Sequence, residues 1–126
     1  MTVNQRTLHH ILVFIYGACI ATLSLLPSDD AITFNIWDKA QHFAAYAVFM
    51  TLAFPIGKSR KAHLCTAFGI LLFSIFIEYA QQFSPGRDTS IEDAIANSLG
   101  VISGYVFSGW LAKIYQSRGN KAAPSI

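Results

Sequence analysis

The sequence predicts an all-α, polytopic membrane protein: a four-transmembrane-helix bundle that forms a single domain over residues 1–126. Of the 126 residues, 53% are hydrophobic and 13% are charged, whereas a soluble domain usually carries about 25% charged residues. Mean hydropathy is +0.42. A helix that spans a bilayer needs about 17–25 mostly apolar residues. Four stretches that contain only one acid among them meet this requirement, at 7–28, 40–57, 62–86 and 94–112.

The same composition argues against a disordered chain and against a soluble enzyme. The formal net charge of +2 is too weak for the electrostatic footprint of a nucleic-acid-binding protein. No nucleic-acid partner is therefore expected.

The first predicted helix covers residues 8–26, and the second covers residues 38–56. Arg6 followed by an apolar run has the outline of a signal peptide, but no small-x-small cleavage site precedes Pro27, so the helix is expected to be retained. Asp38 lies in the first turn of the second helix, where the helix dipole favours an acid.

The third helix is predicted over residues 64–83 and the fourth over residues 93–113. A basic turn precedes the third helix, and the turn signal Pro85-Gly86 follows it. Ser90 and Asp93 have the spacing of a capping box at the start of the fourth helix. The polar tail after this helix is predicted to fray.

The distribution of charge predicts the orientation of the bundle. An even number of spans places both termini on one side, together with seven of the nine basic residues: Arg6, Lys58, Arg60, Lys61, Lys113, Arg118 and Lys121. By the positive-inside rule, both termini are cytoplasmic. All seven acids fall near the opposite, outer side: Asp29, Asp30, Asp38, Glu78, Asp88, Glu92 and Asp93.

Polar residues inside the predicted spans converge on this outer side. Asp38, His42 and Tyr46 recur at intervals of four and therefore share one face of the second helix. Glu78 and Gln81 lie near the outer end of the third helix, Asp93 and Asn97 near the outer end of the fourth, and Arg87 in the connecting loop. Three helices and one loop are therefore predicted to form one outer pocket.

A purely structural interpretation stays open beside this one. Acids at helix N-termini are common, and Lys39 can extend its amine to the lipid headgroups. Ionisable groups within a span are costly, which makes Glu78 and His42 functional candidates, but Glu78 could instead pair with Arg87 in a structural network. The Gly100-x-x-x-Gly104 pattern predicts close helix packing within the bundle in preference to a dimer contact.

These residues are similar to the motifs of VanZ-like membrane proteins. Residues 38–46 resemble the D-K-x-x-H-F-x-x-Y element of that family. The family's E-x-x-Q, P-G-R, D-x-x-x-N and G-x-x-x-G elements are matched in order by residues 78–81, 85–87, 93–97 and 100–104. The resemblance covers about residues 8–112.

The resemblance implies a multi-pass protein of the bacterial plasma (inner) membrane. The family is named for a protein associated with low-level resistance to teicoplanin, a lipoglycopeptide antibiotic that acts on the cell envelope. A resistance role is therefore an expectation for this chain, although many relatives occur in bacteria without such resistance. The resemblance leaves the reaction, if any, and the cofactor unassigned.

The first functional hypothesis is a protein that binds or modifies a membrane lipid, a lipid-linked glycan precursor or a lipoglycopeptide. Its candidate catalytic residues are His42, Glu78, Asp38 and Asp93, of which His42 or Glu78 would act as general acid or base. Its candidate ligand-binding residues are Lys39, Tyr46, Gln81, Arg87 and Asn97, of which Arg87 would hold a phosphate or carboxylate. Whether the protein is an enzyme is left open.

Two alternatives come from other classes. Asp38, His42, Glu78 and Asp93 could bind zinc or manganese, but no H-E-x-x-H or similar spacing supports such a site, and no metal ligands are assigned. The polar cluster could instead belong to a non-enzymatic scaffold that binds another envelope protein. Transport is disfavoured because no polar path continues to the cytoplasmic side. The oligomeric state is left open.

Overall fold

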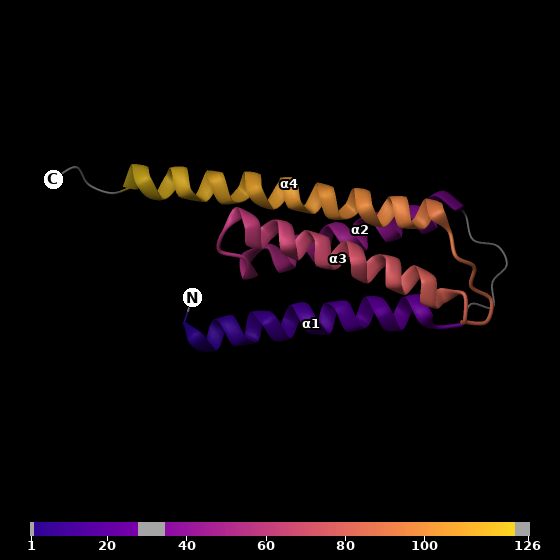
Figure 1. The fold of residues 1–126 in the computed structure, drawn as a ribbon. Coiled ribbons are helices and arrows are strands. Elements are labelled where there is room, and N and C mark those ends of the chain that lie inside the picture. The colour runs from indigo at the N-terminus through magenta and orange to yellow at the C-terminus, as the bar shows by residue number, and fades with distance from the viewer. Residues whose placement is uncertain (1, 28–34, 123–126) are drawn as a thin grey trace.

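The computed structural model describes residues 2–27 and 35–122, and these residues form four α-helices (Figure 1). The helices are α1 (Val3–Leu25), α2 (Asn35–Ala53), α3 (Arg60–Gln81) and α4 (Ile91–Ala122), with a single 3-10 turn, η1 (Phe54–Ile56), after α2. The start of α1 and the end of α4 lie at one end of the bundle. The end of α1, the end of α3 and the start of α4 lie at the other, here called the polar end (Figure 1). The all-α prediction is confirmed.

Side-chain caps determine where the helices begin. The hydroxyl of Thr2 accepts a hydrogen bond from Gln5 N (3.3 Å), and the Gln5 side chain accepts one from Thr2 N (2.9 Å). This capping box starts α1 at Val3 rather than at residue 8, because two otherwise unpaired N–H groups are satisfied there. Ser59 caps α3 by a single bond, since its hydroxyl accepts from Ala62 N (3.1 Å).

The C-terminal part of α4 corrects one expectation. The helix continues to Ala122, so the segment from Lys113 that was predicted to fray is helical as far as that residue. No proline interrupts residues 113–122, and the helix continues through Gly119 and Asn120. At this end α4 extends beyond the other helices (Figure 1).

Three helices are long and apolar enough to cross a membrane, over Val3–Leu25, Arg60–Gln81 and Ile91–Asn120. The second helix is not among them, because polar residues in its first turns, including Asp38 and Lys39, lower its mean hydropathy. The prediction of four spans is thus supported for three helices by length and composition.

The bundle is apolar outside and partly polar inside. Large apolar side chains are strongly exposed, among them Phe14 (78%) and Phe76 (66%). Polar side chains are buried between the helices: Ser74, Glu78, Gln81, Asp93, Asn97 and Ser108. This distribution is that of a protein whose surroundings are hydrocarbon, in which ionisable groups face the bundle interior.

The core is built around the contact between α2 and α4. Tyr46 and Met50 of α2 and Val101 of α4 are almost completely buried, and α2 makes more contacts with α4 than any other pair of helices does. A side chain at Gly100 would collide with the carbonyl oxygen of Phe43, and one at Gly104 with the next turn of α2. The predicted packing of these glycines inside the bundle is therefore confirmed for this pair of helices.

Candidate functional site

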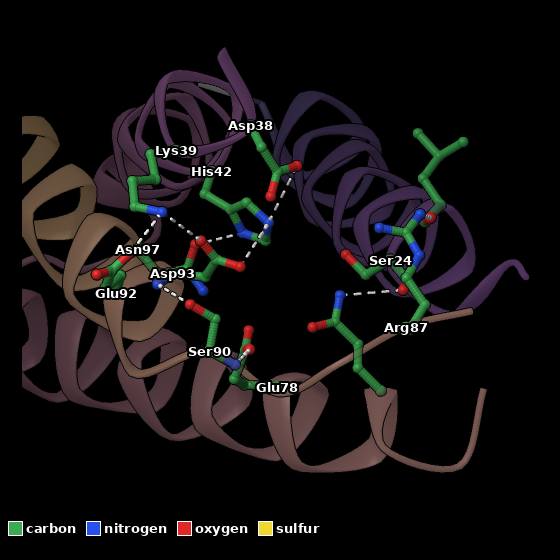
Figure 2. Close-up of polar contacts among 12 residues, drawn as sticks. Ser24, Asp38, Lys39, His42, Glu78, Arg87, Ser90, Glu92, Asp93 and Asn97 are labelled. Atoms are coloured by element: carbon green, nitrogen blue, oxygen red, sulfur yellow. Dashed lines mark hydrogen bonds and ion pairs between the residues drawn. The ribbon is translucent and has the colours of Figure 1, made fainter. Parts of the chain in front are cut away.

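The candidate site lies at the polar end of the bundle, where side chains from three helices and one loop meet (Figure 2). Asp29 and Asp30, two of the acids expected on this side, lie outside the described residues. The remaining predicted site residues are all described, and their contacts fall into three groups. These are the start of α4, the surroundings of His42, and the end of α1.

The start of α4 is held by a serine and by a glutamate from another helix. Ser90 caps the helix, since its hydroxyl accepts a hydrogen bond from Asp93 N (3.3 Å). In the predicted capping box the Asp93 side chain would accept a hydrogen bond from the Ser90 N–H. The Ser90 N–H instead donates to Glu78 Oε1 of α3 (2.6 Å). The carboxylate of Asp93 is thereby left to face α2.

His42 connects α2 to α4 through both nitrogens of its ring (Figure 2). Its Nδ1 lies 3.0 Å from Asn97 Oδ1. Its Nε2 lies 3.9 Å from Asp38 Oδ1, one turn earlier on α2, and 3.9 Å from Asp93 Oδ2 on α4. The predicted common face of Asp38 and His42 is confirmed by this arrangement.

Lys39 forms the outer side of the same cluster. Its Nζ lies 2.6 Å from Glu92 Oε2 and 3.9 Å from Asp93 Oδ1. Glu92 is largely exposed, whereas Asp93 is buried. Lys39 thus pairs with acids of α4 and places a positive charge on the side of Asp93 that faces away from His42.

Residues at and after the end of α3 hold the end of α1. Gln81 Nε2 donates to Ser24 O (3.0 Å), and Ser84 Oγ donates to Leu25 O (2.6 Å). The guanidinium of Arg87 donates to two further carbonyls of this segment, at 3.2 and 3.3 Å. The last carbonyls of a helix have no intrahelical partner, so these three side chains satisfy them.

This arrangement differs from the structural alternative in which Glu78 pairs with Arg87. Glu78 binds the backbone of Ser90, and Arg87 binds the carbonyls of α1. Within the described residues the two side chains form no ion pair with each other. The sequence offered no sign that Arg87 would cap another helix, because the carbonyls involved lie more than 60 residues earlier in the chain.

A pocket of about 340 Å³ opens beside these groups, between α1, α2 and the end of α3. Five of the predicted site residues line it: Asp38, His42, Tyr46, Gln81 and Arg87. Lys39, Glu78, Asp93 and Asn97 lie outside its lining and contact the residues or the loop around it. The structure therefore brings the nine predicted residues to one end of the bundle but gives only five of them a direct position in the pocket wall.

Ser24 and Gln41 also line the pocket and were not among the predicted residues. Gln41 follows Asp38 by three positions, so the helical period could have indicated it. Ser24 contributes from α1, which carries no charged residue near its end, and no pattern in the sequence marks it.

The residues able to hold a metal ion are a subset of those considered from the sequence. Asp38, His42 and Asp93 each offer one ligand atom, and the three atoms lie within 4.8 Å of one another. Glu78 is not part of this group, because its carboxylate binds the Ser90 N–H.

The tyrosine of the pocket wall has an unusual environment. Tyr46 is 1% exposed, and its hydroxyl has no hydrogen-bond partner among the described residues. A buried polar group without a partner costs about 1–3 kcal/mol, so a hydroxyl beside a polar pocket indicates a place for water or a ligand.

Comparison with known proteins gives the family. No curated protein and no solved structure matches the chain. A family model described as VanZ/LLP1 matches residues 3–113, a stretch that contains every candidate site residue. The predicted resemblance is confirmed, and the chain belongs to the VanZ/LLP1 family.

Proposed function

We propose that this protein is a four-span protein of the bacterial plasma membrane whose outward-facing pocket binds the headgroup of an envelope lipid or lipid-linked glycan. Both termini are cytoplasmic in this proposal, and the polar end of the bundle faces outward. The observation that carries it is the pocket of about 340 Å³ that combines a guanidinium, an imidazole, an amide and a buried hydroxyl.

The second helix serves as the fourth span in this arrangement. Its 19 residues measure about 28 Å at 1.5 Å per residue, close to the ~30 Å of a hydrocarbon core. Its polar residues gather in the first two turns, and the remainder packs against α4. The basic residues at the opposite end of the bundle then satisfy the positive-inside rule.

The lining of the pocket suits a ligand that is polar at one point and apolar at another. Arginine has five N–H groups, and Arg87 uses two N–H···O contacts on the end of α1. Its other donors are suited to a phosphate or carboxylate. Ile20, Leu23 and Ala45 supply the apolar side of the pocket.

The proposal is tested by native mass spectrometry of the full-length protein released in a mild detergent. The wild-type protein is expected to retain a lipid or glycolipid, and Arg87→Ala to lose it. Arg118→Ala is the matched control, because it removes the same charge from an exposed position at the other end of α4. Equal retention by all three proteins, or none by the folded wild type, would contradict headgroup binding.

The topology has a separate test in intact cells. After replacement of Cys19 and Cys65, a single cysteine at position 88 is expected to react with a membrane-impermeant maleimide added outside. A single cysteine at position 58 should react only after the membrane is opened. The reverse pattern would invert the proposed orientation.

Chemistry on the bound lipid would draw on His42, which lines the pocket, and on Glu78 through its hold on the start of α4. If the protein turns over the lipid that it binds, His42→Ala should abolish turnover in a folded protein, whereas Glu78→Gln, which keeps an oxygen to accept the Ser90 N–H, should retain it. A teicoplanin-resistance role is tested by expressing the wild type and Arg87→Ala in a susceptible host and comparing inhibitory concentrations. Equal resistance in the two strains would show that resistance does not depend on the Arg87 side of the pocket.

A non-enzymatic scaffold remains the second candidate, and a specific observation favours it. Gln81, Ser84 and Arg87 all donate to carbonyls at the end of α1, which fastens one helix to the rest of the bundle. On this reading Arg87→Ala lowers the melting temperature and the abundance of the protein together with any phenotype. A folded Arg87→Ala protein at normal abundance that has lost its lipid would exclude it.

A further inference from the structure

We propose that Asp38, His42 and Asp93 bind a divalent transition-metal cation such as Zn²⁺ or Mn²⁺ at the polar end of the bundle. One imidazole and two carboxylates from two different helices converge on a single point (Figure 2). The inference goes beyond headgroup binding and does not depend on it, because these three groups form the site without Arg87.

The hydrogen bond of His42 determines which ring nitrogen is available. Nδ1 lies 3.0 Å from Asn97 Oδ1, a carbonyl oxygen that can only accept, so Nδ1 carries the proton. In the neutral ring, Nε2 then presents its lone pair to Asp38 Oδ1 and Asp93 Oδ2, each 3.9 Å away. These separations are too long for hydrogen bonds. A lone pair that faces two carboxylates is unfavourable unless a cation lies between them.

The spacing of the three donors fits such a cation. Zinc binds histidine and carboxylate at about 2.0–2.2 Å, and tetrahedral bonds of that length hold two ligand atoms about 3.4 Å apart. The two contacts of His42 Nε2, at 3.9 Å, need to close by about half an ångström to reach that spacing. The two carboxylate oxygens lie within 4.8 Å of each other and need to close by up to about 1.4 Å. The mixture of imidazole and carboxylate suits borderline metals, and the protein supplies three ligands, which leaves positions for water or a ligand oxygen.

The groups around the three donors are those that support a metal ligand. A histidine that binds a metal through one nitrogen usually donates its other N–H to an oxygen, as His42 does to Asn97. Lys39 Nζ lies 3.9 Å from Asp93 Oδ1, the carboxylate oxygen that does not face His42. Carboxylates outnumber amines in this cluster, since Glu92 and Asp93 lie beside Lys39 and a third carboxylate, that of Asp38, lies beside His42. A divalent cation balances that excess of negative charge.

Two buried polar atoms without a hydrogen-bond partner among the residues that the structure describes also indicate a ligand at this place: one belongs to Asp93 itself, and the other, the hydroxyl of Tyr46, is independent of the three donors. Asp93 is 7% exposed, and its Oδ1 has no hydrogen-bond partner in the described part of the chain. The hydroxyl of Tyr46, 1% exposed, is also unpaired there and lies in the wall of the pocket that Asp38 and His42 line. The Tyr46 hydroxyl can donate a hydrogen bond to an oxygen of a ligand bound beside a cation, whereas Asp93 Oδ1 can only accept one, from water or from a ligand hydroxyl.

The test is metal binding by the full-length protein in detergent micelles after removal of metals by a chelator. Zn²⁺ is titrated calorimetrically and Mn²⁺ by electron paramagnetic resonance. The wild type is expected to bind one ion per chain. Asp93→Asn and His42→Ala are each expected to weaken binding by at least tenfold, since each removes a ligand. Asn97→Ala should weaken it by about tenfold through the lost support of His42.

Asp88→Asn is the matched control, because it removes a carboxylate from the exposed loop before α4 without touching the cluster. It should bind metal as the wild type does. Zn²⁺ should also raise the melting temperature of the wild type and of Asp88→Asn but not that of Asp93→Asn. This readout separates lost metal from a misfolded variant.

A folded wild type that binds neither ion in the micromolar range would overturn the inference. Binding that survives His42→Ala but is lost on replacing His9 and His10 would place the ion at the opposite end of the bundle and also overturn it. Loss of lipid in Arg87→Ala with metal binding intact would support both proposals. Lipid retention by Arg87→Ala together with metal binding would contradict the headgroup-binding proposal and leave the metal site supported.

Discussion

Gly100 is the position at which the structure makes its sharpest prediction about the link between packing and the candidate site. A Cβ added there would collide with the carbonyl oxygen of Phe43 and approach Ala47 N to 3.0 Å. Both atoms belong to the backbone of α2, so no side-chain rotation relieves the contact. Phe43 directly follows His42, and Asn97 lies one turn before Gly100 on α4, so the displacement falls on the His42–Asn97 hydrogen bond.

The magnitude follows from two opposed effects. Replacing a helical glycine by alanine stabilises a helix by about 1 kcal/mol, whereas overpacking an interior usually costs about 1–3 kcal/mol. Because the obstructing atoms are backbone atoms, Gly100→Ala is expected near the upper part of that range. The free energy of unfolding of Gly100→Ala is therefore expected to be lower by about 1–2 kcal/mol than that of the wild type. Any ligand of His42 should also be retained more weakly.

Gly109 provides the matched control on the same helix. A Cβ at this position meets no atom within 4 Å, so Gly109→Ala should gain up to about 1 kcal/mol from helix propensity. Unfolding of both variants in mixed micelles with increasing denaturing detergent, followed by circular dichroism, measures the difference. Equal stability of the two variants, or a more stable Gly100→Ala, would refute the close approach of α2 and α4.

Three further substitutions test individual contacts, each by the same unfolding measurement. Glu78→Ala should cost about 2 kcal/mol, since it removes a charged acceptor from the Ser90 N–H at 2.6 Å; an unchanged stability would argue against that tether. Glu92→Gln should lower the stability only slightly, and less still at high salt, because its pair with Lys39 is exposed; a large, salt-independent loss would contradict this. Ser84→Ala should cost about 1 kcal/mol through the lost bond to the end of α1, and a neutral result would mean that water replaces the hydroxyl.

The helices themselves could be predicted because their signals are local. Four long runs that contain a single charged residue among them, and the turn at Pro85-Gly86, place all four helices in order. The first helix begins before its predicted span and the last continues beyond its own, because helix ends depend on weaker local effects. A capping box at Thr2 starts α1 early, and no proline stops α4 between Lys113 and Ala122.

Much of the site could also be predicted, because helical periodicity assigns residues to faces. The spacing of Asp38, His42 and Tyr46 placed them together on α2, and they line one pocket. What could not be predicted is which side chain binds which partner. The spacing of Ser90 and Asp93 suggested a reciprocal cap, yet Glu78 takes the Ser90 N–H because α3 brings its carboxylate within 2.6 Å.

The sequence by itself determined the apolar helices, their order, the concentration of acids at one end and the family. Each of these follows from the composition and spacing of residues near one another in the chain. The tertiary structure alone decided that Arg87 holds the end of α1, that Ser24 enters the pocket and that Asp93 faces His42. These contacts join residues that are distant in sequence, and the distance and orientation between two helices depend on how closely their backbones can approach, as at Gly100.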